Sequence, residues 1–510
     1  MISVSNKFDI RRKTMKKLLA VILALCLAAG LTTSAFAAAP DLVIAVDADV
    51  DTLHFSDHST TVEINVLNQI FDPLIYMNPD GSEAPEPRIA ESWEISDDGL
   101  DYTFHIRPGI KFHDGSSLTA ADVAFSLEMY MVSEYQGAFV EGLDTVEVLD
   151  DYTVVCHLAN PFSPFMLGLA SCYIASKAYH DAVSAEEFAS APVGCGPYQY
   201  VSRAAGSNIV LKAFEDYYGG APSIKNLTFK VIPDTTTSAI ALQTGEVDFA
   251  EIDSSNLVML ERNPAVTISE APTSGFTFVS MNTEKEPFNN VAFRQAINYA
   301  INREELIEIC YDGKAEVNSN MCAKTRFGYS DSQLQYTYDK EKAIALLAEA
   351  GIETPYDLGT ILVAEKYQKI AVVLQEDLAD IGLNTTIRTE EFNTYIKSLT
   401  SGNYDLCALE MTLEGDTQQL ALAFTTDWIG MANNARYSDE QMDALFAAAA
   451  VETDVEKRAE IFNEIFTKAQ NEAIYAVICN PEILYAYNAN LTVPAFVLEG
   501  YYYVNQFSWA

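Results

Sequence analysis

The spacing of apolar and polar residues predicts strands in the N-terminal half of the chain. Residues 93–95 and 102–106 each alternate between apolar and polar side chains, and an Asp-Asp-Gly turn at 97–99 separates them. This arrangement predicts a β-hairpin. Thr119, followed three residues later by Asp122, has the sequence of a capping box and predicts that a helix begins directly after it. The polar residues of this region therefore have explanations in turns, caps and exposed faces.

Strand and helix patterns alternate in two separate parts of the chain. In the first part we expect strands at 227–232, 247–252 and 266–270 and helices at 235–243 and 255–262. In the second part we expect strands at 360–364, 383–388 and 405–410 and helices at 367–381 and 391–399. Such alternation predicts parallel pairing with right-handed crossovers. Each part therefore predicts one α/β sheet, and the two sheets indicate two lobes.

Two apolar stretches are placed to connect these parts. Residues 276–282 form a predicted strand that leads from the first sheet to the second. A long amphipathic helix at 455–472 precedes apolar strands at 474–479 and 483–487, which we expect to return the chain. The aromatic segment at 500–504 is then expected to pack on the first lobe. Two crossings predict a hinge between the lobes.

The N-terminus has the pattern of a secretory signal. Six basic residues precede an apolar run at 18–31, and Ala35-Phe36-Ala37 supplies a small-x-small cleavage sequence. We expect residues 1–37 to be removed on export. Cys26 is a weak candidate for lipidation, because Leu25 is larger than the small residue that precedes a lipidated cysteine. No later run reaches the roughly 18 apolar residues that span a membrane, so we expect a protein that does not cross one.

The charge of the chain is strongly acidic. There are 31 Lys and Arg residues against 72 Asp and Glu, a net charge of −41. Without residues 1–37 the balance is 25 against 71, a net charge of −46. A field of this sign repels phosphate backbones and favours cationic partners, which argues against nucleic-acid binding.

Seven cysteines follow residue 37, and they are odd in number and scattered. No CxxC spacing indicates a zinc site. Cys310 and Cys322 are close enough in sequence to form one disulfide in an oxidising compartment. The others are expected to be buried small hydrophobic residues.

Sequence motifs for catalysis are missing. The chain has no GxSxG elbow and no GxxxxGK[ST] phosphate loop, and Gly194-Cys195-Gly196 lacks the third glycine of a dinucleotide fingerprint. Paired carboxylates are abundant, so a glycosidase-like hydrolase stays open as the least favoured alternative. We predict neither an enzyme nor a cofactor.

A metal-binding alternative rests on the segment HFSDH at 54–58. His54 and His58 are four residues apart and would share one face of a helix, with Asp57 as a further oxygen ligand. Phe55 stands where the HExxH motif has its glutamate, which argues against a metalloprotease. All six histidines precede residue 181, so a metal held between two lobes would need carboxylates from the second.

Several motifs follow one another in the order of a known family. They are PRIAESW at 87–93, RPGIKFHDG at 107–115, LTAADV at 118–123, GCGPY at 194–198, ALQTGEVD at 241–248 and FRQAINYAINR at 293–303. This set resembles the family 5 extracellular solute-binding proteins, the receptors of peptide and nickel ABC importers. The resemblance covers most of the chain after the signal segment. Its motifs are specific for the family and say little about the ligand.

The resemblance implies an α/β, two-lobed periplasmic-binding-protein fold, type II-like, with an extra subdomain in the first lobe and a two-crossing hinge. We expect residues 41–76, 200–275 and 488–510 to form the core of lobe I, 77–199 its extra subdomain and 276–487 lobe II. The implied function is that of a monomeric receptor, periplasmic or extracellular, which closes around a di- or oligopeptide and delivers it to an ABC permease. A metal complex or an oligosaccharide stays open as an alternative ligand.

Candidate ligand contacts follow from the place of the cleft, because ligands of open α/β sheets lie beyond the carboxyl ends of the strands. In the second lobe, Met411 and Glu414 align where dipeptide-binding relatives have a tryptophan and an aspartate that takes the ligand's α-amino group, and Asp416 follows. Glu414 and Asp416 could equally belong to a solvated loop.

Further candidates come from the segment after the strand at 42–46, from two glycines of the first lobe and from the end of the first crossing strand. They are Thr52, His54, Ser59, Thr60, Gly194, Gly196 and, at the end of the first crossing strand, Asn282. Ser59 and Thr60 precede a predicted helix at 62–70, whose free amides could take a ligand carboxylate, although helix capping is their commoner role.

Overall fold

A computed structural model of the protein describes residues 41–77, 85–133, 135–271, 273, 275–322, 324, 327–412, 416–494 and 501–510. The chain divides into two units, Met1–Pro40 and Asp41–Ala510, and the second contains all of these residues. The predicted signal segment at 1–37 and the candidate ligand residue Glu414 lie outside them.

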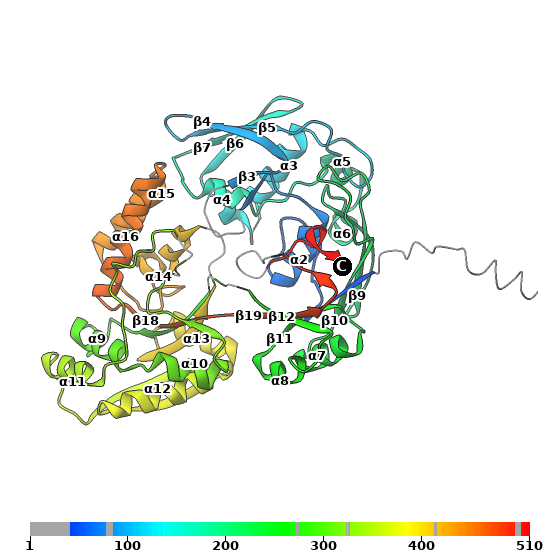
Figure 1. The fold of residues 1–510 in the computed structure, drawn as a ribbon. Coiled ribbons are helices and arrows are strands. Elements are labelled where there is room, and N and C mark those ends of the chain that lie inside the picture. Colours follow the sequence, from blue (N-terminus) through cyan, green and yellow to red (C-terminus); the bar gives the residue numbers. More distant parts are fainter. Residues whose placement is uncertain are drawn as a thin grey trace, which may run out of the picture. The chain divides into compact units, whose positions relative to one another are not determined.

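The first sheet of the second unit has seven strands (Figure 1). In spatial order they are β12 (Val266–Ala271), β19 (Ile483–Asn488), β11 (Phe249–Ile252), β1 (Leu42–Val46), β10 (Asn226–Val231), β9 (Asn208–Ala213) and β8 (Tyr198–Ala204). β1 pairs in parallel with both β10 and β11, as the alternation predicts. The parallel pairing predicted for β12 is wrong, because β19 returns from the far end of the chain and pairs antiparallel with β11 and β12.

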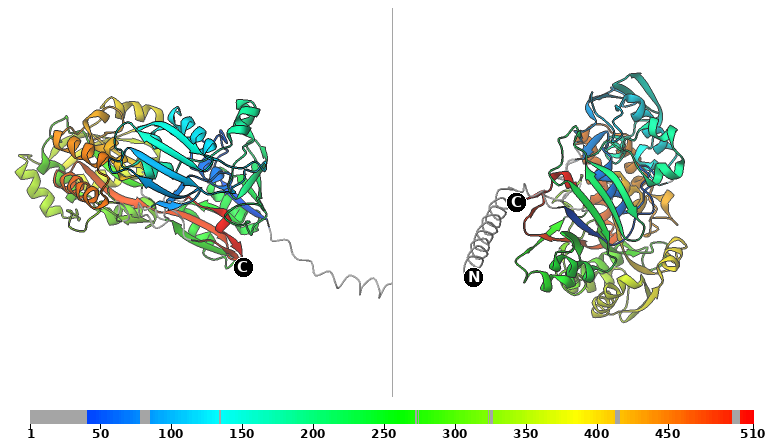
Figure 2. Two further views of the ribbon diagram at one scale, coloured as in Figure 1. Left: turned by 90° about the horizontal axis from the view of Figure 1, so that it is seen from above. Right: turned by 90° about the vertical axis from the view of Figure 1, so that its right-hand side faces the viewer.

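Three helices accompany this sheet: α2 (Thr61–Ile70), α7 (Thr235–Thr244) and α8 (Leu257–Leu260). The side chain of Asp234 caps the start of α7, and Gly245 ends it with a φ of 74°. The C-terminal segment, red in Figure 2, includes β20 (Leu491–Thr492) and β21 (Ser508–Trp509). Its residues Tyr502, Val504 and Phe507 are buried in the core of this sheet, which confirms the packing expected for the aromatic segment.

A second, four-stranded antiparallel sheet shares that core. Its strands in spatial order are β4 (Ala90–Ile95), β5 (Asp101–Ile106), β7 (Thr153–Leu158) and β6 (Leu143–Asp150). Nearby elements are β2 (Ile75–Met77), β3 (Pro85–Pro87), α3 (Ala120–Met131), α4 (Phe165–Leu169), α5 (Lys177–Ala182) and α6 (Ala185–Ser190). The predicted hairpin is confirmed as β4 and β5, and the capping box of Thr119 and Asp122 is present.

The third large sheet has six strands and a core of its own. In spatial order they are β14 (Ala315–Val317), β18 (Tyr475–Pro481), β13 (Phe276–Met281), β17 (Leu406–Met411), β15 (Tyr356–Ala364) and β16 (Leu383–Glu390). β15 pairs in parallel with β16 and β17, as predicted. All six residues of β13 are buried, since it lies inside the sheet between two antiparallel partners.

Helices of this third region carry the caps expected from the sequence. They are α9 (Val291–Ala300), α10 (Arg303–Tyr311), α11 (Lys340–Glu349), α12 (Gln368–Asp380), α13 (Phe392–Thr400), α14 (Ala421–Phe424), α15 (Glu440–Val451) and α16 (Val455–Asn471). Asn302 caps α10 and Asp339 caps α11. Cys310 and Cys322 are not joined to each other, so the disulfide considered for this pair is not formed.

The described chain passes twice between the seven-stranded and six-stranded sheets. The first passage joins β12 to β13, and the second joins β18 to β19, which follow each other closely in Figure 1. β19 belongs to the seven-stranded sheet, whereas the sequence analysis assigned residues 276–487 to the second lobe. The return therefore comes after Pro481 and not after residue 487, because the pattern of two successive apolar strands does not show where one sheet ends and the next begins.

Candidate functional site

A cavity of about 530 Å³ lies where the ends of the seven-stranded and six-stranded sheets meet. Its lining includes Asp47 directly after β1 and Met411 and Thr412 at the end of β17. These are carboxyl ends of strands in both sheets, which is where the sequence analysis expected a ligand. The volume lies within the range of about 300–1,000 Å³ that is usual for small-ligand pockets.

The chemistry of the lining is aromatic and acidic. Phe249, Phe276, Tyr485, Tyr501 and Tyr502 supply the rings. Asp47, Glu251 and Glu410 supply three carboxylates, and no Lys, Arg or His is found among the described residues that line the cavity. The arrangement therefore favours a solute with a positively charged group and some apolar surface.

Glu410 is held in place by contacts within the six-stranded region. It accepts hydrogen bonds from the hydroxyls of Tyr311 at 3.1 Å and Thr277 at 3.4 Å, and Lys366 Nζ lies 3.6 Å from its other oxygen. This carboxylate is therefore partly neutralised by the protein itself. It lies on the strand that also carries Met411.

Glu251 is open to the cavity yet surrounded by protein on its other sides. Desolvation raises the pKa of this carboxyl group to about 7, and the charges of Asp47 and Asp253 act in the same direction. A pKa near neutrality in a cleft is typical of functional sites. Neither Glu251 nor Asp47 was among the candidates from the sequence, although an acidic residue inside the apolar strand predicted at 247–252 was a usable signal.

The start of α2 lies at the cavity but does not offer free amides. Thr60 lines the cavity and caps the helix in a capping box with Glu63. The amides of Ser59 and Thr60 donate to Glu63 Oε2 at 2.8 and 3.0 Å, and those of Asp51 and Thr52 donate to Oε1 at 3.0 and 3.1 Å. An internal carboxylate, that of Glu63, therefore occupies the amides that the sequence offered to a ligand carboxylate.

That internal carboxylate is strongly held. Burial by itself raises the pKa of Glu63, but the four backbone hydrogen bonds outweigh this effect and hold the pKa below its ordinary value. Glu63 is thus charged at neutral pH and fixes the loop that precedes α2.

Thr52 and His54 are not found among the residues that line the cavity. Thr52 Oγ1 accepts a hydrogen bond from the backbone N–H of His54 at 2.9 Å. The ring of His54 stacks on Phe55 and meets the edge of Phe188, with ring centres 5.1 and 5.2 Å away. Both candidate residues therefore have structural contacts that explain them.

The metal alternative loses its geometric basis at residues 54–58. His54 and His58 lie in a turn before α2, not on one face of a helix. Burial lowers the pKa of His54, and it lowers that of His58 to about 4. Across the described ranges, no three His, Cys, Asp or Glu side chains are grouped so that they could hold a metal ion.

Gly194 and Gly196 approach the protein's own backbone, and neither lines the cavity. A Cβ atom on Gly194 would lie 2.0 Å from the carbonyl oxygen of Ile70, and one on Gly196 would lie 2.7 Å from its carbonyl carbon. The N–H of Gly196 donates to the same oxygen at 2.9 Å. Close packing against the end of α2 requires glycine here, which replaces the expectation that this backbone lies beside a ligand.

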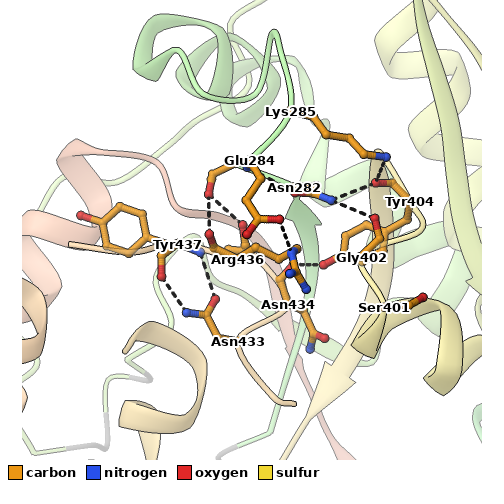
Figure 3. Close-up of polar contacts among 12 residues, drawn as sticks. Asn282, Glu284, Lys285, Ser401, Gly402, Tyr404, Asn433, Asn434, Arg436 and Tyr437 are labelled. Carbon is orange, nitrogen blue, oxygen red and sulfur yellow. Dashed lines mark hydrogen bonds and ion pairs between the residues drawn. The ribbon is translucent and has the colours of Figure 1, made fainter. Parts of the chain in front are cut away.

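Asn282 follows the last residue of β13, whereas Phe276 at the start of this strand lines the cavity. Figure 3 shows the surroundings of Asn282. Its Nδ2 donates to the carbonyl oxygens of Gly402 and Tyr404 at 3.1 and 3.2 Å. Lys285 donates to the second of these oxygens as well. Asn282 therefore ties two strand ends together, and it is not among the described residues that line the cavity.

Asp416 is buried against helix α16 and is not a free carboxylate. Arg458 donates to both of its oxygens, at 2.9 and 2.5 Å, and Asp416 also caps the short 3-10 helix at Thr417–Leu420. Both oxygens of Asp416, which the sequence offered as a ligand contact, are therefore engaged within the protein. Of the candidates from the sequence, the structure brings together Met411 and Thr60 at the cavity.

Comparison with known proteins places these observations in a family context. Residues 84–427 match the sequence model of the bacterial extracellular solute-binding proteins, family 5 Middle. The heme-binding protein A of Haemophilus influenzae is 32% identical over 79% of this chain and 80% of its own length. The dipeptide-binding protein of Escherichia coli is 30% identical over 78% and 81%, respectively.

A solved structure extends the similarity to the fold. The ABC transporter-associated periplasmic binding protein DppA from Helicobacter pylori, in complex with the peptide STSA, has a TM-score of 0.75 at 27% identity. The match covers 92% of this chain and 98% of that one. The two-lobed α/β fold predicted from the sequence is thereby confirmed.

Proposed function

Because this chain belongs to the bacterial extracellular solute-binding proteins of family 5, we propose that it is the receptor of an ABC importer for a di- or oligopeptide. The family binds solutes and does not catalyse reactions on them, so the protein is a receptor and not an enzyme. The peptide is the proposed part of this assignment.

The cavity between the two sheets is the observation that carries the proposal. Asp47 and Tyr485 reach it from the seven-stranded sheet, and Phe276 and Met411 reach it from the six-stranded sheet. A solute in this cavity contacts both lobes at once. Its binding energy then favours the closed form over the open one, and only that difference in free energy shifts the population toward closure.

The charge of the lining favours a peptide over the other ligands known for similar proteins. A peptide brings at least one ammonium group, which Asp47, Glu251 and Glu410 would stabilise. Heme carries propionates and no ammonium group. Glutathione carries two carboxylates against one ammonium group, so its net charge is negative and meets these carboxylates less favourably than a neutral or cationic peptide does. The peptide in the complex from Helicobacter pylori and the name of the Escherichia coli relative support this choice.

The export of the protein, its oligomeric state and its permease partner follow from this role. We propose that residues 1–37 direct export and are then removed, and that the protein acts as a monomer that presents its closed form to the transmembrane subunits of the permease. Within the residues described by the structure, none of the helices is long and apolar enough to cross a membrane.

Titration calorimetry with four ligand classes tests the proposal. We expect dipeptides and tripeptides to bind with dissociation constants near 1 μM, about −8 kcal/mol. Hemin, glutathione and nickel–histidine are expected to bind at least tenfold more weakly under the same conditions. Tightest binding of any of these three would overturn the assignment to peptides.

A further inference from the structure

We infer that Asp47 and Glu251 form a subsite for a positively charged group of the bound peptide, an ammonium or a guanidinium. The inference rests on the proposed function as a peptide receptor and specifies which chemistry that receptor selects. It concerns the seven-stranded sheet, whereas the candidate for an amine contact in the sequence analysis, Glu414, follows β17 of the other sheet.

The two carboxylates lie on neighbouring strands at the same end of the sheet. β1 and β11 pair in parallel, with Ala45 opposite Ala250. Glu251 is one residue beyond that pair on β11, and Asp47 directly follows Val46, the last residue of β1. The charge of Asp47 acts on Glu251 from within the same cavity lining, so one charged group of a ligand can reach both carboxylates. Both residues line the cavity and are exposed to it.

No described residue neutralises this pair. Asp47 and Glu251 have neither an ion pair nor a side-chain hydrogen bond among the described contacts, whereas Glu410 across the cavity has Lys366 and two hydroxyl groups. Two adjacent carboxylates repel each other, and the raised pKa of Glu251 reflects this together with desolvation. A cationic group supplied by the ligand would remove the repulsion.

The walls beside Glu251 suit an organic cation. Tyr485 lies directly opposite Glu251 on β19, so their side chains share one face of the sheet. The rings of Tyr485 and Tyr502 pack against Phe249, with centres 5.0 and 5.2 Å away, and all three rings line the cavity. Aromatic faces next to carboxylates attract alkylammonium and guanidinium groups and cover the carbon atoms that carry them.

Charge removal at constant shape is the direct test. The ligands are the tripeptide Ala-Lys-Ala and three acetylated forms, modified on the α-amine, on the lysine Nζ or on both. The proteins are the wild type, Glu251→Gln, Asp47→Asn and the control Glu128→Gln. Glu128 is an exposed residue on α3 that does not line the cavity. Circular dichroism establishes that each variant is folded before calorimetry.

We expect the wild type and Glu128→Gln to bind one singly acetylated peptide at least tenfold more tightly than the doubly acetylated one. We call the ratio of these two affinities the charge preference. The singly acetylated peptide that binds more tightly shows whether the α-amine or the lysine side chain supplies the charge. Glu251→Gln and Asp47→Asn are each expected to reduce the preference at least fivefold.

The dependence on pH supplies a second readout. Asp47 from β1, Asp253 from the residue after β11, Tyr485 from β19 and Tyr502 from the C-terminal segment face Glu251. Below pH 7 Glu251 gains a proton in the ligand-free protein, so the preference of the wild type should fall between pH 7 and pH 5.5, where a peptide α-amine with a pKa of about 8 stays protonated. The same change should be smaller in Glu251→Gln, which has no carboxyl group to titrate.

Two results would overturn the subsite while leaving the receptor intact. One is equal binding of charged and doubly acetylated peptides by the wild type. The other is an unchanged preference in both Glu251→Gln and Asp47→Asn. Failure of the wild type to bind any of the peptides would instead remove the proposed function, and the subsite with it.

Discussion

Replacing Arg458 by methionine is expected to lower the free energy of unfolding by about 3–5 kcal/mol. Arg458 and Asp416 are both buried, with 6% and 5% of their surfaces exposed, and the guanidinium holds both carboxylate oxygens. Arg458 also donates to the carbonyl oxygen of Ala449 and packs on the ring of Phe462. Methionine keeps much of the apolar contact but leaves a buried carboxylate without its counter-charge.

Urea unfolding followed by circular dichroism measures this loss. Lys457→Met is the matched control, because Lys457 is exposed and lies 3.8 Å from Asp454 at the surface, where a pair contributes at most about 1 kcal/mol. The double variant Asp416→Leu with Arg458→Met should recover part of the loss, since it removes the stranded charge. Equal effects of Arg458→Met and Lys457→Met would show that the buried pair does not stabilise the fold.

Replacing Gly194 by alanine is expected to cost about 3 kcal/mol, at the upper end of the usual range for overpacking. The added Cβ atom would lie 2.0 Å from the carbonyl oxygen of Ile70 and 2.8 Å from the ring of Phe71. Ile70 ends α2 and accepts a hydrogen bond from Gly196, so neither backbone can move away without breaking that contact. The clash is with the main chain, which cannot rotate aside as a flexible side chain can.

Thermal unfolding compared with Gly137→Ala checks this prediction. The Cβ atom of that control would meet Tyr130 at 3.4 Å, an ordinary contact, so its effect should stay below about 1 kcal/mol. Gly194→Ala should leave the peptide affinity of the folded fraction unchanged, because Gly194 does not line the cavity. A stable Gly194→Ala protein that has lost peptide binding would return this residue to the ligand site.

Much of the fold follows from the sequence, because local patterns specify it. Periodicity, caps and turn residues predicted the hairpin of β4 and β5, the start of α3 and the parallel strands β15, β16 and β17. The pairing of β19 with β11 and β12 was beyond such reasoning. It joins strands more than 200 residues apart, and nothing in a local pattern shows which edge a returning strand takes.

The sequence predicted where the site lies but not which side chains form it. Strand order gave the carboxyl ends of β1 and β17, and the cavity lies there. Whether an individual side chain is available to a ligand was harder to predict, because its hydrogen-bond partners come from distant segments. Asp416 is engaged by Arg458, and the amides before α2 are engaged by Glu63. A carboxylate or an amide is free to bind a ligand only if the fold does not use it, and the sequence does not show that use.

Native mass spectrometry of the protein purified without unfolding tests the central claim most directly. The account predicts a native mass above the denatured mass of the same sample, with the excess released as short peptides that carry a free amine or a basic side chain. An excess that consists of heme, a metal chelate or an anionic solute would contradict the peptide receptor and its acidic cavity.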